Sequence, residues 1–453
     1  MWKSLTLTAL AGALVAVAMS PLLADEQFAV TTIVNLPDGQ NLGAFDISFV
    51  EQKSHTYALA ASRVVGSAGA LPGNVFGEVV IVDTKSNLVT KELKSAEFPF
   101  AGACSFPARN SVSGPNGVIV IEKGSNTDVW AGDGPVLTAS GISHICVTTG
   151  TPPSPIPGDI AQPSSVKVFD LKTGALKTPP IYTGGIGRAD ELCYNPVSDV
   201  VLIANDETFD NFITFISEDS YEVLFQIKFD GSDKNAGIDP ETGNPIKANG
   251  IEQCIFNPGD GNFYINIPNT VKGSNTTAPG VTLRISGQAP FTVEKIFDFA
   301  QAPLNSTGCT GGTGIAIGPG NQLANSCGLI IDDSTGNVIA NFQNEGGADE
   351  IWYNPRDNHY FFADSTCRQK VTTTGCLGVV DAGTPSADPV AGTAPGSHSV
   401  AADAAGNRVY VPIRGNYGIA AAPFGALCST ATDVFGNAGS DALGCIGVYT
   451  SSN

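Results

Sequence analysis

The stretch Asp190-Glu-Leu-Cys-Tyr-Asn-Pro196 decides the fold, because it recurs as Glu252-Gln-Cys-Ile-Phe-Asn-Pro258 and as Asp349-Glu-Ile-Trp-Tyr-Asn-Pro355. Each copy joins a short apolar run, typical of a β-strand, to an Asn-Pro turn. Looser copies lie at residues 46–51 and 398–403, and degenerate copies are expected near residues 101–106 and 313–318. A second apolar run follows each clear copy. The chain therefore repeats a unit built from strands.

A second pattern gives the number of repeats. An apolar strand followed by an Asp or Ser turn occurs seven times, at residues 77–83, 165–170, 212–217, 281–286, 328–333, 377–381 and 445–449. Four short strands per unit, repeated seven times, predict an all-β fold, a seven-bladed β-propeller. The run Phe28-Ala-Val-Thr-Thr-Ile-Val34 would supply the missing outer strand of the last unit and close the ring. Six or eight blades, or two β-sandwiches, are the alternatives.

The first residues have the pattern of an export signal. One Lys precedes a short apolar run and then small residues, so residues 1–24 are interpreted as a cleaved signal peptide rather than a membrane anchor. Residues 25–453 then form a single propeller domain, with a large loop insertion near residues 123–162, which are rich in Gly, Pro, Ser and Thr. No later segment has the length to cross a bilayer. We expect a secreted or periplasmic protein without membrane contact after cleavage.

Composition and cysteines agree with export. The chain has 453 residues and a net charge of −20, which disfavours binding to a nucleic-acid backbone. Ten cysteines in an oxidising compartment favour disulfides. Nearest-neighbour pairing predicts Cys367–Cys376, Cys428–Cys445 and Cys309–Cys327, and leaves Cys104–Cys146 and Cys193–Cys254 as weaker pairs. Connectivity cannot be fixed by spacing alone.

Alignment on the Asn-Pro turn brings ionisable residues into one register. The shared position, about one residue before the first strand of a blade, holds Asp46, Asp190, Glu252, Asp349 and His398. Because that strand lines the central channel of a propeller, these side chains should converge on one mouth. The next position holds Glu191, Gln253 and Glu350, which strand alternation would direct elsewhere, for example at a neighbouring blade.

Converging carboxylates repel one another unless their pKa values rise or a cation binds. We expect a divalent cation, Ca²⁺ above all, held by Asp46, Asp190, Glu252 and Asp349, with Zn²⁺ or Mn²⁺ as alternatives. His398 and Asp349 are the predicted catalytic residues. Arg188, Glu191 and Glu350 are the predicted substrate-binding residues, although a salt bridge from Arg188 to Asp190 or Glu191 would explain that arginine equally well. A water-filled mouth whose carboxylates cross-link blades is the alternative to a metal site.

The Asp-Glu-x-x-Tyr-Asn-Pro pattern, together with His398-Ser-Val-Ala-x-Asp-x-x-Gly-Asn-x-Val-Tyr-Val411, resembles secreted propellers of the YVTN/lactonase-like and SMP-30/gluconolactonase-like superfamily. The resemblance covers nearly the whole mature chain. It implies a divalent cation at the channel mouth and a hydrolase of the lactonase or esterase type that acts on a small molecule. The alternative is a non-catalytic secreted propeller that binds a protein or polysaccharide partner. We expect a monomer in either case.

Overall fold

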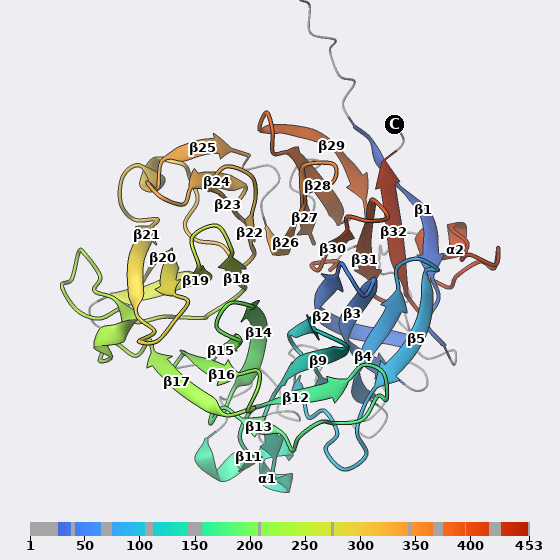
Figure 1. Ribbon diagram of the computed structural model, residues 1–453, viewed down its shortest axis with the longest axis horizontal. Coiled ribbons are helices and arrows are strands. Elements are labelled where there is room, and N and C mark those ends of the chain that lie inside the picture. Colours follow the sequence, from blue (N-terminus) through green and yellow to red (C-terminus); the bar gives the residue numbers. More distant parts are fainter. Residues whose placement is uncertain are drawn as a thin grey trace, which may run out of the picture.

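The chain forms a ring of seven four-stranded antiparallel sheets, as the repeats predict (Figure 1). The computed structural model describes residues 26–37, 41–64, 75–104, 112–143, 156–206, 210–272, 276–342, 347–365, 375–394, 396–415 and 427–451. The predicted signal peptide, residues 1–24, lies outside the described residues. Within them, no helix is long and apolar enough to span a membrane.

The first four blades, named in chain order, have the following strands. Blade 1 contains β2 (Asn41–Glu51), β3 (Thr56–Val64), β4 (Val75–Asp83) and β5 (Leu88–Leu93). Blade 2 contains β8 (Val118–Lys123), β9 (Asn126–Asp133), β12 (Ser165–Asp170) and β13 (Ile181–Tyr182). Blade 3 contains β14 (Arg188–Asn195), β15 (Val200–Asp206), β16 (Phe212–Ser217) and β17 (Val223–Lys228). Blade 4 contains β18 (Cys254–Asn257), β19 (Asn262–Lys272), β20 (Thr276–Ser286) and β21 (Val293–Asp298).

The last three blades complete the ring. Blade 5 contains β22 (Ile315–Ile317), β23 (Gln322–Asn325), β24 (Leu329–Asp332) and β25 (Val338–Asn341). Blade 6 contains β26 (Ala348–Asn354), β27 (His359–Asp364), β28 (Cys376–Asp381) and β29 (Ser386–Gly392). Blade 7 contains β30 (Ala401–Asp403), β31 (Arg408–Ile413), β32 (Cys445–Ser451) and β1 (Phe28–Val34).

Outside the blades lie two small hairpins and short helices. The hairpins are β6 (Ala103–Cys104) with β7 (Val112–Ser113), and β10 (Val136–Leu137) with β11 (Ile160–Gln162). The α-helices are α1 (Ala139–Gly141) and α2 (Leu427–Thr430), and the 3₁₀ turns are η4 (Pro157–Asp159), η5 (Lys234–Ala236) and η6 (Leu304–Ser306).

Each sequence pattern marks one kind of strand. All seven copies of the Asp- or Ser-turn pattern fall on the third strand, from β4 to β32. The Asn-Pro copies and their looser relatives fall on inner strands β2, β14, β18, β26 and β30, and the degenerate copy near residues 313–318 falls on β22. The N-terminal strand β1 pairs antiparallel with β32, so closure of the ring by the N-terminal strand is confirmed.

Blade 2 corrects two expectations. Its inner strand is β8 and not residues 101–106, where β6 belongs to a two-stranded hairpin. The predicted loop near residues 123–162 begins with β9, a fully paired strand whose Trp130 is buried. The reason is local: Gly124, at φ +63°, makes a tight turn between β8 and β9, so this blade has no Asn-Pro turn to mark it. The insertion proper begins after β9.

The hydrophobic core lies between the blades. Seven clusters of buried apolar side chains each join two neighbouring blades, including one between blades 7 and 1. Successive side chains of a strand point to opposite faces of its sheet and pack against different neighbouring blades. In β3, Tyr57 and Leu59 face blade 7, whereas Ala58 and Ala60 face blade 2. The inner strands contact one another in chain order, and β30 contacts β2, so they enclose a central channel.

Within the described residues, two disulfides close short local loops and a third crosses a blade interface. The predicted pairs Cys309–Cys327 and Cys428–Cys445 are confirmed, and so is Cys193–Cys254, which links the inner strands of blades 3 and 4. The other two predicted pairs each include a residue outside the described ranges. These crosslinks fit an oxidising extracellular environment.

Candidate metal centre in the central channel

Three inner strands carry a β-bulge at the same height in the channel. The bulged pairs are Asp46-Ile47 opposite Ala60, Asp190-Glu191 opposite Ala204, and Asp349-Glu350 opposite Ala363. Asn266 likewise bonds to the backbone of both Glu252 and Gln253 just before β18 begins. A bulge leaves one residue unpaired and turns its side chain away from regular alternation. The aligned acids of β2, β14 and β26 therefore lie within these strands, and only Glu252 and His398 precede theirs as expected.

The bulges bring three predicted residues together. A ligand atom from each of Asp46, Asp349 and His398 lies within 4.8 Å of the other two. These residues come from blade 1, blade 6 and the approach to blade 7, and a hydrogen bond from Glu350 N to His398 O (3.1 Å) ties the last two together. All three side chains are partly exposed to the channel. We call this group the three-residue cluster.

His398 has the orientation of a ligand or a base. Its Nδ1 lies 2.7 Å from Gly396 O, and because a carbonyl only accepts, Nδ1 must donate. In the neutral ring Nε2 is then the acceptor nitrogen, and it lies 3.8 Å from Asp46 Oδ1. The ring stacks on Phe45, with 4.8 Å between centroids. Backbone and aromatic contacts thus fix which nitrogen faces the carboxylates, as they do for metal-binding histidines.

Arg188 explains why Asp190 stays out of the cluster. Its Nε lies 2.8 Å from Asp190 Oδ2 and 3.3 Å from Asp206 Oδ2, and its Nη1 lies 3.4 Å from Asp46 Oδ2. The contact with Asp190 is an ion pair rather than an aligned hydrogen bond. The alternative role considered for Arg188, a salt bridge with Asp190, is therefore present. About a third of the arginine side chain remains exposed to the channel.

One guanidinium does not balance the carboxylates around it. Five carboxyl groups lie close enough to influence the charge of one another or of Arg188: Asp46, Asp190, Asp206, Glu252 and Asp349. Burial raises the pKa of Asp46, and it raises the pKa values of Asp190 and Glu252 well above the usual carboxyl range, although Arg188 opposes each shift. Burial alone would lower the pKa of Arg188, but Asp190, Asp46 and Asp206 raise it. The site holds excess negative charge that protons or a cation must offset.

Two residues that follow the aligned acids, Glu350 and Gln253, bond to other blades, as alternation predicts. Glu350 Oε2 accepts hydrogen bonds from Ser48 N (3.3 Å), Ser399 Oγ (2.6 Å) and Val400 N (3.0 Å), so it joins blades 6, 1 and 7. Gln253 Oε1 accepts from Ile315 N (2.6 Å) and from Ile351 N (3.4 Å). Glu350 therefore serves the assembly of the ring, whatever role it has toward a substrate.

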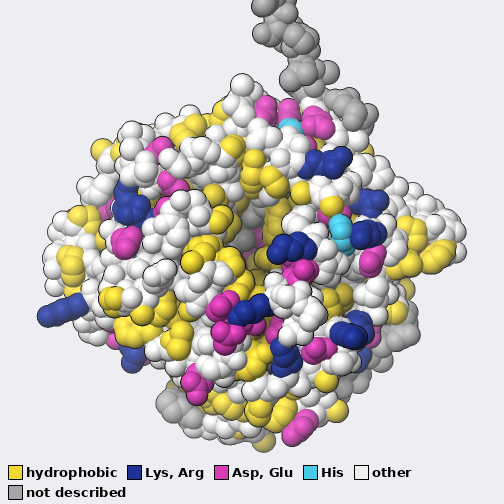
Figure 2. All heavy atoms as spheres, viewed as in Figure 1, with side chains coloured by type: hydrophobic (Ala, Val, Ile, Leu, Met, Phe, Trp, Pro, Cys, Tyr) yellow, Lys and Arg dark blue, Asp and Glu magenta, His cyan; other side chains and the backbone are white. Residues whose placement is uncertain are grey.

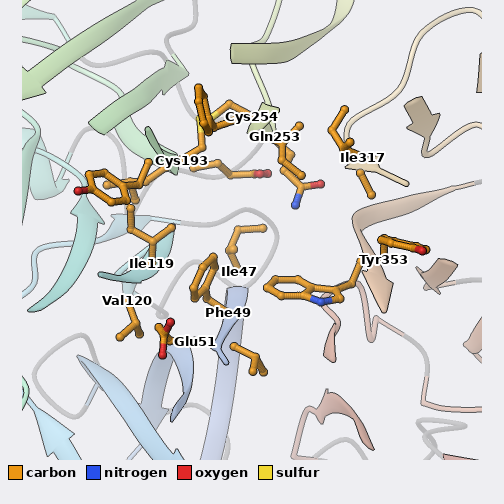
Figure 3. Close-up of a pocket in the computed structure, with 18 of the residues that line it drawn as sticks. Ile47, Phe49, Glu51, Ile119, Val120, Cys193, Gln253, Cys254, Ile317 and Tyr353 are labelled. Atoms are coloured by element: carbon orange, nitrogen blue, oxygen red, sulfur yellow. A yellow bond between two sulfur atoms is a disulfide. The ribbon is translucent and has the colours of Figure 1, made fainter. Parts of the chain in front are cut away.

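The half of the channel toward the Asn-Pro turns is an apolar chamber. Its volume is about 750 Å³, and it is lined by inner-strand side chains such as Ile47, Phe49, Ile119, Ile317 and Trp352. Figure 3 shows Phe49, Ile119 and Ile317 around a central space, with the Gln253 amide directed toward it. Hydrophobic side chains also gather around the hollow at the centre of the face in Figure 2. Glu191, Gln253 and Glu350 are the polar residues at its inner end.

Two features of the site were not predicted. Asp206, the last residue of β15, contacts Arg188 and accepts from Ile251 N (3.4 Å). Asp206 ends the second strand of its blade and pairs with Arg188 in the β14–β15 ladder, and this position could have indicated its place in the site. The chamber gives no signal in the sequence, because the inner-strand positions between the acids and the Asn-Pro turns are apolar like the positions of the core.

Comparison with known proteins adds no family. No protein-family model and no curated protein sequence matches the chain. Among solved structures, a chain described as "Crystal Structure of Mitotic Checkpoint Complex" is similar over 90% of this chain and 95% of that one, at 11% identity and a TM-score of 0.48. A chain of Kuenenia stuttgartiensis hydrazine synthase is similar over 82% and 92%, at 12% identity and a TM-score of 0.38. Neither similarity carries a functional conclusion, and the resemblance to lactonase-like propellers stays a prediction.

Proposed function

We propose that the protein is a metal-dependent hydrolase of the lactonase or esterase type, with its centre at the three-residue cluster. The observation that carries the proposal is the convergence of Asp46, Asp349 and His398 from separate blades, with ligand atoms within 4.8 Å of one another. Three protein ligands that leave a position open are typical of catalytic rather than structural metal sites.

The ligand atoms of the three-residue cluster favour a different metal from the one that the acidic register alone predicts. Ca²⁺ takes oxygen ligands, whereas imidazole nitrogen suits Zn²⁺ and related transition metals and carboxylate suits Mn²⁺. With His398 Nε2 directed at Asp46, the proposal favours Zn²⁺ or Mn²⁺ over the Ca²⁺ expected from the acidic register. A bound cation of this kind would polarise a carbonyl group and acidify a water molecule.

Residues around the cluster supply the remaining functions. The exposed part of Arg188, which contacts Asp46, offers N–H donors to a carbonyl or carboxylate oxygen of the substrate. Glu252, whose pKa burial raises well above the usual carboxyl range, is the candidate proton donor to a leaving alkoxide. Asp190 has a positioning role, because it holds Arg188 through the 2.8 Å ion pair.

Hydrolysis by reconstituted protein tests the proposal. Protein stripped with a chelator is reloaded with Zn²⁺, Mn²⁺ or Ca²⁺ and assayed on a panel of small lactones and aryl esters. We expect metal-dependent hydrolysis, with Zn²⁺ or Mn²⁺ above Ca²⁺, and a loss of about 100-fold or more in His398→Ala and Asp349→Asn. Glu241→Gln, a change at an exposed rim position, is the matched control. Absence of hydrolysis with every metal, or full activity in His398→Ala, would overturn the proposal in favour of a secreted binding protein.

A further inference from the structure

The apolar chamber ends on the carboxyl group of Glu191. This residue is 3% exposed, and its buried Oε2 has no hydrogen-bond partner among the described residues. The corresponding residues of two other blades, Gln253 in blade 4 and Glu350 in blade 6, accept hydrogen bonds from other blades. A buried carboxyl group normally has such partners, because leaving it unpaired is costly. Glu191 is therefore the one inner-end carboxyl in the described chamber lining that blade assembly does not use.

The surroundings of Glu191 select the charge of a ligand. The charged groups that act most strongly on it are Asp190, Glu252, Asp349 and Glu350, all of them carboxyl groups. Arg188, the cation nearby, is held by ion pairs to Asp46, Asp190 and Asp206. Burial, together with these carboxyl groups, raises the pKa of Glu191 well above the usual carboxyl range. A cation at the inner end of the chamber would offset this concentration of acidic groups, whereas a carboxylate or phosphate would add to their repulsion.

The walls select the rest of the ligand. Phe49 and Trp352 line the chamber and meet edge to face, with 5.4 Å between ring centroids. Aromatic and aliphatic walls favour an apolar skeleton, and aromatic faces also attract organic cations. The volume of about 750 Å³ lies in the range of about 300–1,000 Å³ that is typical of small-molecule sites.

We propose that the apolar chamber binds a hydrophobic organic amine, with its ammonium group against Glu191 and its apolar skeleton against the aromatic wall formed by Phe49 and Trp352. This site lies on the Asn-Pro side of the acidic register and uses none of the residues of the three-residue cluster. It does not depend on the proposed hydrolase, because binding to the chamber requires neither a metal nor a reaction.

Three matched probes test the proposal on full-length mature protein. The probes are 4-phenylbutylamine, 4-phenylbutanol and 4-phenylbutanoate, which share a skeleton and differ in the charge of the end group. Binding is followed by calorimetry and by tryptophan fluorescence, with metal removed by a chelator. We expect the amine to bind about 10- to 100-fold more tightly than the alcohol, as for a hydrogen bond to a charged group, and the carboxylate to bind most weakly.

Variants separate the outcomes. Glu191→Gln keeps the shape of the side chain and should reduce the preference for amine over alcohol to within a few-fold. Trp352→Leu should weaken all probes, while Trp130, buried inside blade 2, reports that the fold is intact. His398→Ala removes the proposed metal ligand and should leave the amine preference unchanged, so the two proposals fail separately. Equal binding of amine and alcohol by the wild type, or a preference retained in Glu191→Gln, would overturn this inference.

Discussion

Glu350 provides the sharpest test of how the ring is held together. Its Oε2 accepts from two buried backbone N–H groups, Ser48 N and Val400 N, which belong to blade 1 and to the approach to blade 7. Glu350→Ala leaves both donors without an acceptor, and each buried unsatisfied donor costs about 1–3 kcal/mol. The serine hydroxyls add little, because Ser399 Oγ and Ser48 Oγ lie 2.8 Å apart and can bond to each other when the carboxylate is removed. We therefore expect the free energy of unfolding to fall by about 2–6 kcal/mol.

Urea unfolding at pH 6, followed by far-ultraviolet circular dichroism, measures this loss. Glu350→Gln retains a carbonyl oxygen and should lose about 1 kcal/mol, within the range of one altered hydrogen bond. Glu241→Ala removes an acid whose side chain is 58% exposed, and should change stability by less than about 1 kcal/mol. A change below about 0.5 kcal/mol in Glu350→Ala, at unchanged denaturant dependence, would refute the reasoning.

Three further predictions concern the same ring. Stability should fall as pH rises from 4.5 toward 8, because burial raises the pKa of Glu350 from 4.5 to about 8 and the folded state then holds a proton that the unfolded state has lost. Glu350→Gln should flatten this part of the urea-stability profile, and an unchanged slope would contradict the assignment. Replacing Cys193 and Cys254 by Ser opens a loop of 61 residues and should cost up to about 4 kcal/mol in unfolding experiments under oxidising conditions, whereas equal stability would contradict a stabilising crosslink. A chain beginning at Asn35 lacks β1, leaves β32 unpaired on one side and should lose cooperative thermal unfolding; a normal transition would contradict closure by β1.

The strands could be predicted from the sequence because every blade has the same arrangement of four strands and therefore needs similar residues at the same positions. Third strands are buried on both faces and end in Asp or Ser turns, so their pattern survives in all seven blades. Inner strands are marked most clearly where an Asn-Pro turn follows them, as in β14, β18 and β26. Blade 2 replaces that turn with Gly124-Ser125, and its first two strands were therefore misassigned.

The candidate site was predicted in part. The repeat register identified Asp46, Asp349 and His398, which the fold brings together. The sequence could not reveal the bulges, because a bulge depends on how many residues the partner strand places opposite, here one alanine in each case. Nor could it separate Asp190 from the cluster, since that depends on the position of Arg188 between three carboxylates.

Direct metal binding tests the central claim, a divalent cation held by Asp46, Asp349 and His398. Isothermal titration of chelator-treated protein with Zn²⁺ and with Mn²⁺, supported by elemental analysis after dialysis, gives stoichiometry and affinity. We predict one bound ion per chain in the wild type, at least 10-fold weaker binding in His398→Ala, and no binding above background in the Asp349→Asn/His398→Ala double variant. Absence of a bound ion in the wild type, or one ion per chain with undiminished affinity in the double variant, would contradict the account.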